Sequence, residues 1–171
     1  MRVALLSDTH SHLDLSFFNL ITEMDEIWHA GDIGDQTVLK KLQEWKPVRA
    51  VFGNIDSPAI RHTLPEVLRI DVDGLKILMT HIGGTPPRYN PHVRKLLKDE
   101  PADVLICGHS HILKVMKDPN YNNMLYINPG AAGNHGFHRI KTFIRFEISD
   151  KAVRKLEVIE LGKRGEVKDD Q

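Results

Sequence analysis

The sequence predicts an α/β fold in which two mixed β-sheets pack as a sandwich and are flanked by helices. Up to about residue 55, apolar runs of strand length alternate with stretches of helical periodicity, an order that favours parallel strands. From residue 66, apolar runs follow one another around turns, as antiparallel strands do. A chain of 171 residues with 41% hydrophobic content can bury such a core, so we expect one domain over residues 1–161 and a polar C-terminal tail over residues 162–171.

The first half of the chain begins with the apolar run Val3–Leu6, which has the length of a buried strand. Apolar side chains then recur twice at helical spacing, and Pro47 ends the second of these stretches. We expect strands at residues 3–6, 26–30 and 49–52, and helices at residues 13–24 and 37–45.

The second half opens with two apolar runs on either side of Asp73-Gly74, a pair typical of a β-hairpin turn. A Pro-rich turn, a helix and further apolar runs follow. We expect a hairpin of strands 67–72 and 75–80, a helix at about 90–98, and strands at 103–107, 112–116, 124–127, 142–148 and 152–160.

Metal-ligating residue types follow five of the expected strands. The carboxyl ends of parallel strands are where α/β sheets place their ligands, and neighbouring glycines let the backbone turn tightly there. The residues concerned are Asp8, His10, Asp32, Asn54, His81, His109 and His111. Seven oxygen and nitrogen ligands suit two divalent cations better than one. If Asp32 bridges two ions, each collects about four protein ligands and keeps an open position.

These motifs resemble those of the calcineurin-like metallophosphoesterase superfamily. Its pattern is Asp-x-His, Gly-Asp, Gly-Asn, a His after a later strand, and Gly-His-x-His, and the order here is most similar to the small single-domain bacterial and archaeal phosphodiesterases. The resemblance runs from Asp8 to Gly130. It implies a four-layer α-β-β-α fold and a di-metal centre, commonly of manganese, with iron, nickel, zinc and magnesium as the other candidates.

The resemblance also assigns roles by position. Asp8, His10 and His111 would hold one ion, Asn54, His81 and His109 the other, and Asp32 would bridge them. The catalytic residues would be Asp32, Asn54 and His81, with in-line attack on phosphorus by a hydroxide that bridges the metals.

One departure from the family pattern concerns the leaving group. Many members have a histidine after Gly-Asn, whereas this chain reads Gly53-Asn54-Ile55-Asp56. Because Ile55 has no proton to donate, we expect activated aryl diesters to be hydrolysed faster than unactivated ones. Asp56 is expected to orient a ligand by a hydrogen bond.

The remaining marked residues receive weaker assignments. His12, His135, His138 and Arg139 are candidate substrate contacts, since they follow the ligand loops or the Asn128-Pro129-Gly130 segment. The histidines after that segment are alternatively candidates to replace the missing proton donor. His29, His62 and His92 are assigned no role. Cys107, Trp28 and Trp45 are expected in the core.

Composition limits the partners. Lys+Arg and Asp+Glu are equal at 23 each, and no basic stretch interleaved with aromatic residues offers a track for a strand, so we expect no long nucleic acid. One cysteine excludes an intrachain disulfide and suits a cytoplasmic location. The first apolar run is too short for a signal peptide or membrane span, so no membrane contact is expected.

The leading functional hypothesis is therefore a divalent-metal-dependent phosphodiesterase that acts on small phosphodiesters. A phosphomonoesterase is chemically adjacent, because the same centre serves both reactions. A non-catalytic protein-interaction scaffold of the same fold is the alternative from another class. A homo-oligomer is left open by the sequence.

Overall fold

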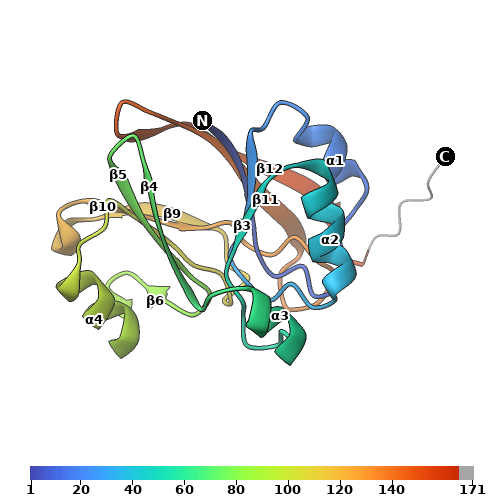
Figure 1. Ribbon diagram of the computed structural model, residues 1–171, viewed down its shortest axis with the longest axis horizontal. Helices are drawn as coiled ribbons and strands as arrows, with labels where there is room; N and C mark the ends of the chain where they lie inside the picture. Colours follow the sequence, from blue (N-terminus) through green and yellow to red (C-terminus); the bar gives the residue numbers. More distant parts are fainter. Residues whose placement is uncertain (166–171) are drawn as a thin grey trace.

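The computed structural model describes residues 1–165 and contains two five-stranded sheets (Figure 1). The first sheet has the order β12 (Ala152–Lys163), β11 (Ile140–Ser149), β1 (Arg2–Leu6), β2 (Glu26–His29), β3 (Val48–Ala50). The second has the order β4 (Val67–Val72), β5 (Leu75–Thr80), β8 (Val104–Ile106), β10 (Met124–Asn128), β9 (Lys114–Asp118). A short hairpin pairs β6 (Gly84–Thr85) with β7 (Arg88–Tyr89).

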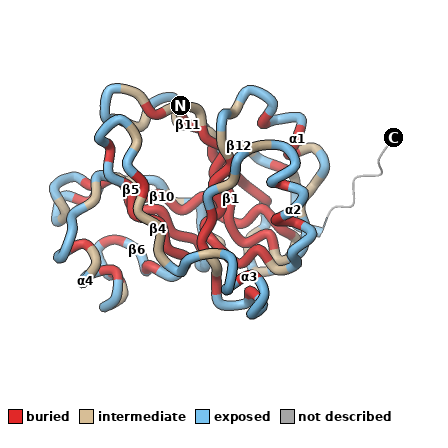
Figure 2. The backbone as a smooth tube through the Cα atoms, viewed as in Figure 1, coloured by how far each residue is buried: buried red, intermediate tan, exposed pale blue. Residues whose placement is uncertain are grey.

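Buried apolar side chains form three clusters, one between the two sheets and one between each sheet and its helices, which makes four layers. Figure 2 shows that the buried residues lie along the strands of both sheets. Between the sheets, side chains such as Val3 and Leu5 of β1 meet Ile77 and Met79 of β5. Outside the first sheet lie α1 (Ser16–Leu20), α2 (Gln36–Trp45) and α3 (Pro58–Thr63), and outside the second lies α4 (Pro91–Asp99). The predicted sandwich of mixed sheets with flanking helices is confirmed.

Parallel pairing places the ligand-bearing loops at one edge of each sheet. Strands β1, β2 and β3 are mutually parallel in the first sheet, and β5, β8 and β10 are mutually parallel in the second. The predicted metal-ligating residues all follow strands of these two sets, namely β1, β2, β3, β5 and β8. The antiparallel strands β4, β9, β11 and β12 complete the sheets without contributing to this set.

Several elements differ from the sequence-based expectation. Helix α1 is shorter than the predicted 13–24, because the side chain of Asp14 pairs with Lys141 and the carbonyl of Thr22 accepts from Lys46 Nζ, which fixes both flanks as loops. Trp45 is 45% exposed rather than buried, since it is the last residue of α2, where its ring packs against Phe18.

The other differences concern elements that the sequence did not indicate. They are α3, the β6–β7 hairpin and a 3₁₀ turn at Pro119–Tyr121. Strand β12 continues through Lys163, so Gly162 and Lys163 of the expected tail pair with β11. Residues 166–171 of that tail lie outside the described residues. Within residues 1–165, no helix is both long and apolar enough to cross a membrane.

Candidate metal centre

The candidate ligands lie on backbone of unusual conformation. Left-handed φ values between 46° and 66° occur at Asp8, His10, Asp32, His109 and His111. This conformation is unfavourable for residues with a Cβ, and it persists only where the surrounding structure enforces it, commonly at functional sites. The tight turns after β1, β2 and β8 therefore direct these short side chains toward one region.

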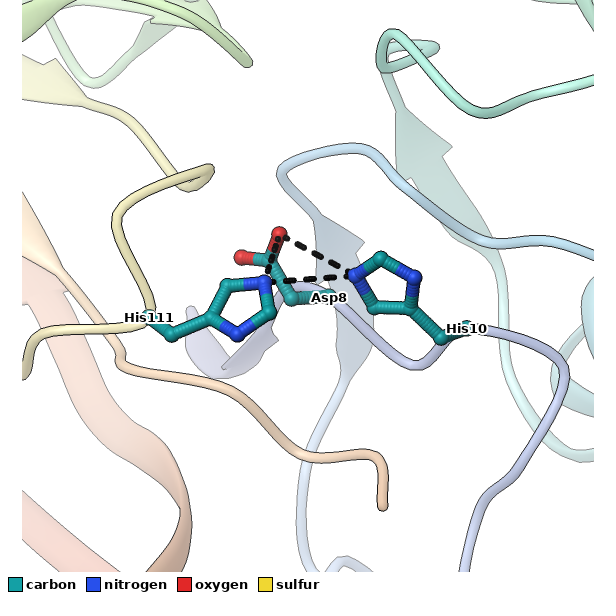
Figure 3. A group of neighbouring side chains, drawn as sticks. All are labelled: Asp8, His10 and His111. Carbon is teal, nitrogen blue, oxygen red and sulfur yellow. Dashed lines mark hydrogen bonds and ion pairs between the residues drawn. The ribbon is translucent and has the colours of Figure 1, made fainter. Parts of the chain in front are cut away.

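Asp8, His10 and His111, here called the Asp8 group, point toward one another (Figure 3). His111 Nε2 lies 3.2 Å from Asp8 Oδ1 and 3.2 Å from His10 Nε2. Asp8 is fully buried, and its Oδ1 has no hydrogen-bond partner. A buried carboxylate oxygen without a donor is costly unless a cation compensates it.

Asp32, His81 and His109, here called the Asp32 group, form a second cluster. His81 Nδ1 lies 2.8 Å from the carbonyl oxygen of Ala30, so Nδ1 carries the proton and Nε2 presents a lone pair in the neutral ring. That nitrogen faces two oxygens at 3.2 Å, Asp32 Oδ2 and Asn54 Oδ1. In the neutral ring all three atoms are acceptors, so their convergence calls for a proton on Nε2 or a cation between them.

The two groups meet at Asp32. Its Oδ2 lies 3.2 Å from His81 Nε2 and 3.7 Å from His10 Nε2, so one oxygen faces a histidine of each group. Its Oδ1 accepts a hydrogen bond from the Ile55 amide at 3.0 Å, which fixes the carboxylate. Burial alone would raise the pKa of Asp32, but the hydrogen bond and charge of His81 lower it below its usual value.

The pKa of His81 moves in the opposite sense. Burial alone would lower it, yet the hydrogen bond to Asp32 and the negative charges of Asp8 and Asp32 hold the pKa above its usual value. The site is thus an electronegative environment that favours a positive charge at this position. A divalent cation satisfies the same demand without a proton, so the residues present fit a metal centre.

Glycine is required where two loops approach closely. A Cβ built on Gly53 would lie 2.1 Å from Asp32 Oδ1, and one built on Gly136 would lie 2.0 Å from His111 Nδ1. The second contact shows that the loop of residues 131–140 folds against the Asp8 group. A side chain at either position would displace a candidate ligand.

Three polar residues hold the ligand loops from outside. Asp56 is buried and accepts from the amides of Gly34 and Gly53, both at 2.7 Å, so it joins the loops after β2 and β3. It thus orients backbone rather than a ligand side chain. Arg61 donates to the carbonyls of Gly53, Asn54 and Asp56 at 3.2, 2.7 and 2.8 Å.

The third of these residues is Asn128. Its Nδ2 donates to the carbonyl of Gly108 at 2.8 Å and to Ser110 Oγ at 3.1 Å, on the two sides of His109. Sequence reasoning did not single out Arg61 and named Asn128 only as part of the Asn128-Pro129-Gly130 segment. Arg61 follows its partners by five to eight residues and Asn128 follows its partners by 18 and 20 residues, outside the motifs themselves. A buried asparagine that closes an apolar strand is a usable signal.

The four candidate substrate contacts lie in two different settings. The rings of His135 and His10 are 5.1 Å apart, and those of His138 and His111 are 5.4 Å apart, so both loop histidines adjoin the Asp8 group. His12 is exposed and pairs with Asp14 at 3.1 Å, and Arg139 is also exposed. Within residues 1–165, the side chains of His12 and Arg139 form no hydrogen bond or ion pair with a candidate ligand.

Two cavities open beside the Asp32 group. The Asn54 cavity, of about 310 Å³, is lined by Asn54 and His81 together with polar residues such as Asn90 and His92. The His109 cavity, of about 230 Å³, is lined by residues that include His109, Ile112 and Tyr126. A larger cavity of about 790 Å³ lies by the β4–β5 and β11–β12 turns. None of the candidate ligands lines it, so it is separate from the metal centre.

Comparisons with known proteins agree with this geometry. The family model described as the calcineurin-like phosphoesterase superfamily domain matches residues 1–151. A relative from Methanocaldococcus jannaschii named "Probable metallophosphoesterase" is 30% identical over 166 residues, covering 94% of this chain and 82% of the relative. A protein of the same organism named as a phosphodiesterase is 24% identical over 147 residues, covering 76% of this chain and 83% of that protein.

Solved structures share the fold. An archaeal phosphodiesterase has a TM-score of 0.73 at 22% identity, covering 94% of this chain and all of that chain. Vps29 of Entamoeba histolytica in complex with Zn²⁺ has a TM-score of 0.72 at 19% identity, covering 94% and 99%. At these identities the likeness concerns the fold alone. Together with the family match, it confirms the resemblance read from the motifs: the chain belongs to the calcineurin-like phosphoesterase superfamily, and the names of its relatives support a hydrolase that acts on phosphoric esters.

Proposed function

We propose that this chain hydrolyses small phosphodiesters with the help of two divalent cations. The carrying observation is the convergence of hydrogen-bond acceptors, above all Asp8 Oδ1, which is buried without a hydrogen bond and faces His111 Nε2 at 3.2 Å, and the lone pair of His81 Nε2. Asp8, His10 and His111 would hold one ion, Asn54, His81 and His109 the other, and Asp32 would contact both. When bound, the cations supply water activation and charge stabilisation at the phosphoryl oxygens.

Preorganised ligands support this assignment. The bond of His81 Nδ1 to the Ala30 carbonyl and the bond of the Ile55 amide to Asp32 fix two of the side chains before any cation or substrate arrives. Manganese is the ion we would test first. Iron, nickel, zinc and magnesium also accept ligand sets of imidazole and carboxylate in some combination.

The two cavities favour diesters over monoesters. A phosphodiester carries two ester substituents, and two cavities adjoin the Asp32 group, the Asn54 cavity lined by His81 and the His109 cavity lined by His109. A phosphomonoester would leave one of them empty. The rings of His81 and His109 are 5.2 Å apart, so the two cavities adjoin the same centre.

Leaving-group chemistry follows from the residue at position 55. The Ile55 side chain is 45% exposed and only its amide contacts the centre, through Asp32. Because there is no proton donor at that position, we expect esters with poor leaving groups to be hydrolysed about 10²–10⁴-fold more slowly than by an enzyme with a general acid. Rates on an aryl diester and an alkyl diester should therefore differ widely, and equal rates would contradict this part of the proposal.

The test uses metal-stripped protein with bis(4-nitrophenyl) phosphate and 4-nitrophenyl phosphate, with and without Mn²⁺. Asp32→Ala is the variant, and Asp35→Ala is its matched control because Asp35 only caps α2. We expect manganese-dependent diester hydrolysis that Asp32→Ala abolishes and Asp35→Ala keeps. Preference for the monoester would make the protein a phosphomonoesterase. Binding of Mn²⁺ without cleavage of either ester would favour the scaffold alternative.

A further inference from the structure

His29 is a fully buried histidine in β2 with both ring nitrogens engaged. The Gly31 amide donates to His29 Nδ1 at 3.1 Å, so Nδ1 is an acceptor and the ring proton is on Nε2. His29 Nε2 lies 3.0 Å from Thr9 Oγ1, and Thr9 Oγ1 donates to the carbonyl of Ile33 at 3.0 Å. One tautomer therefore satisfies every donor and acceptor of the chain.

This chain of hydrogen bonds connects the two loops that carry the ligands of the first sheet. Thr9 stands between Asp8 and His10, and Gly31 and Ile33 are the residues on either side of Asp32. Backbone bonds run the same way, because the amides of Asp8 and His10 donate to the carbonyls of Gly31 and Asp32, both at 3.0 Å. The side chain of His29, at the end of β2, thus contacts both the loop after β1 and the loop after β2.

The ring must be uncharged to do this. A protonated imidazole would present a donor at Nδ1 to the Gly31 amide, which is itself a donor. Burial lowers the pKa of His29 to about 3, so the ring stays neutral at physiological pH. This setting differs from that of His81, which faces two carboxylates.

We propose that His29 is a positioning residue for the metal centre: through Thr9 and Gly31 it sets where Asp8 and His10 stand relative to Asp32. The three ligands occupy left-handed backbone, a conformation that needs enforcement by its surroundings. The inference rests on the proposed function only in taking these residues as metal ligands. It concerns how tightly the centre binds Mn²⁺, independent of which ester is cleaved.

A purely structural role for His29 makes a different prediction. If the histidine only filled the core, its loss would lower stability and leave the affinity of the folded protein for metal unchanged. A positioning residue instead changes metal affinity even in variants that remain folded. Loss of an interaction that orients a ligand typically weakens metal binding by about 10–100-fold.

The experiment compares four variants by Mn²⁺ titration calorimetry of the folded protein, with thermal melting measured in parallel. His29→Gln replaces the imidazole with an amide. Thr9→Val removes the hydroxyl that accepts from His29 Nε2, and Thr9→Ser keeps a hydroxyl at that position. Tyr89→Phe is the matched control, because the Tyr89 hydroxyl donates to the buried Asp118 Oδ2 at 2.8 Å on the outer face of the second sheet, away from these two loops.

We expect Thr9→Val and His29→Gln to weaken Mn²⁺ binding by about 10–100-fold, with Thr9→Ser close to wild type. Tyr89→Phe should lose stability and keep its affinity. Wild-type affinity in both Thr9→Val and His29→Gln would overturn the inference, as would an equal loss of affinity in Tyr89→Phe. Mn²⁺ binding by the wild type without ester hydrolysis would overturn the proposed function alone, whereas absence of Mn²⁺ binding would overturn both.

Discussion

Two buried histidines of this protein have pKa values shifted in opposite directions, because different groups surround their rings. His29 and His81 are both buried, but His29 contacts a hydroxyl and an amide, and its pKa falls to about 3. Desolvation acts in the same direction on His81, yet the Asp32 hydrogen bond and the charge of Asp8 leave its pKa raised. Neighbouring charge, more than exposure, thus decides which ring can carry a proton.

The depressed pKa of His29 makes stability depend on pH. Between pH 6.5 and about 3 the unfolded chain protonates this residue and the folded chain does not, so acidification favours unfolding. From pH 6.5 to 4.5 the metal-free wild type should lose about 2 kcal/mol more than His29→Gln. Urea unfolding of both proteins at the two pH values measures this difference. Parallel losses in the two proteins would show that His29 already titrates near pH 6.5 in the folded state.

A second residue-scale prediction concerns Gly53. In Gly53→Ala the new Cβ would meet Asp32 Oδ1 at 2.1 Å, so the carboxylate must move. We expect Mn²⁺ affinity to fall at least about 10-fold, as for other losses of ligand orientation. Ile55→Ala, in the same loop but with an exposed side chain, is the control and should bind Mn²⁺ normally. Calorimetric titration distinguishes the two, and unchanged binding by Gly53→Ala would mean that the loop relaxes.

At the scale of elements, helix α3 serves to hold Arg61 in place. Ser57 caps the helix by accepting from the Ile60 amide, and the Arg61 guanidinium then reaches back to three carbonyls of the loop that bears Asn54. The guanidinium also lies over the Phe52 ring at 5.1 Å. A helix too short to add much to the core thereby fixes one side of the metal centre.

Removing that guanidinium should loosen the Asn54 loop. Arg61→Met keeps the aliphatic stem and loses three hydrogen bonds, at a cost of about 1–3 kcal/mol in unfolding free energy. Mn²⁺ affinity should fall as well, because Asn54 loses its support. Arg94→Met on α4, where the arginine is exposed, is the matched control for both measurements. An effect of equal size in Arg94→Met would refute the assigned role.

A buried ion pair joins β11 to the loop before α1. Lys141 is 1% exposed, and its Nζ lies 2.7 Å from Asp14 Oδ2. Asp14→Ala would leave the ammonium buried and unpaired, so we expect a loss of about 3–5 kcal/mol in urea unfolding. The double variant Asp14→Leu with Lys141→Met should recover most of it, since no charge is then buried. A cost below about 1 kcal/mol for Asp14→Ala would mean that Lys141 reaches solvent in the variant.

At the scale of the whole molecule, the metal centre joins the two sheets. The Asp8 group and the Asp32 group each combine loops of the first sheet with loops of the second, since His81 and the histidines after β8 approach Asp8 and Asp32 across the sandwich. Cations bound there would link the layers at the edge where the parallel strands end. Metal binding and global stability should therefore be coupled.

Saturation with Mn²⁺ should raise the melting temperature. At a free concentration about 100-fold above Kd the gain is about 2.7 kcal/mol, which for a chain of this size corresponds to about 5–11 °C. Chelation should reverse the shift, and Asp32→Asn should reduce it because a neutral amide replaces the carboxylate that faces both groups. Differential scanning calorimetry measures all three. A melting temperature indifferent to Mn²⁺ would contradict the coupling.

The sequence by itself determined the succession of the ten strands of the two sheets along the chain, the β4–β5 hairpin and the set of polar residues at the strand ends. These follow from local patterns: the apolar runs, the Asp73-Gly74 turn and the glycines beside Asp32 and Asn54 carry their signal within a few residues. The β5 strand, for instance, has the predicted bounds. Parallel pairing then brings its loop to the same edge as those of β1 and β8.

Only the tertiary structure decided which distant side chains meet. His29 is 20 residues from Thr9 in the chain, and His10 is 101 residues from His111, so no local pattern reports their contacts. The same holds for the approach of Gly136 to His111 and for the exposure of Trp45. Local periodicity states which face of an element is apolar, whereas the packing of both sheets determines what covers that face and which polar groups are left to bind a cation.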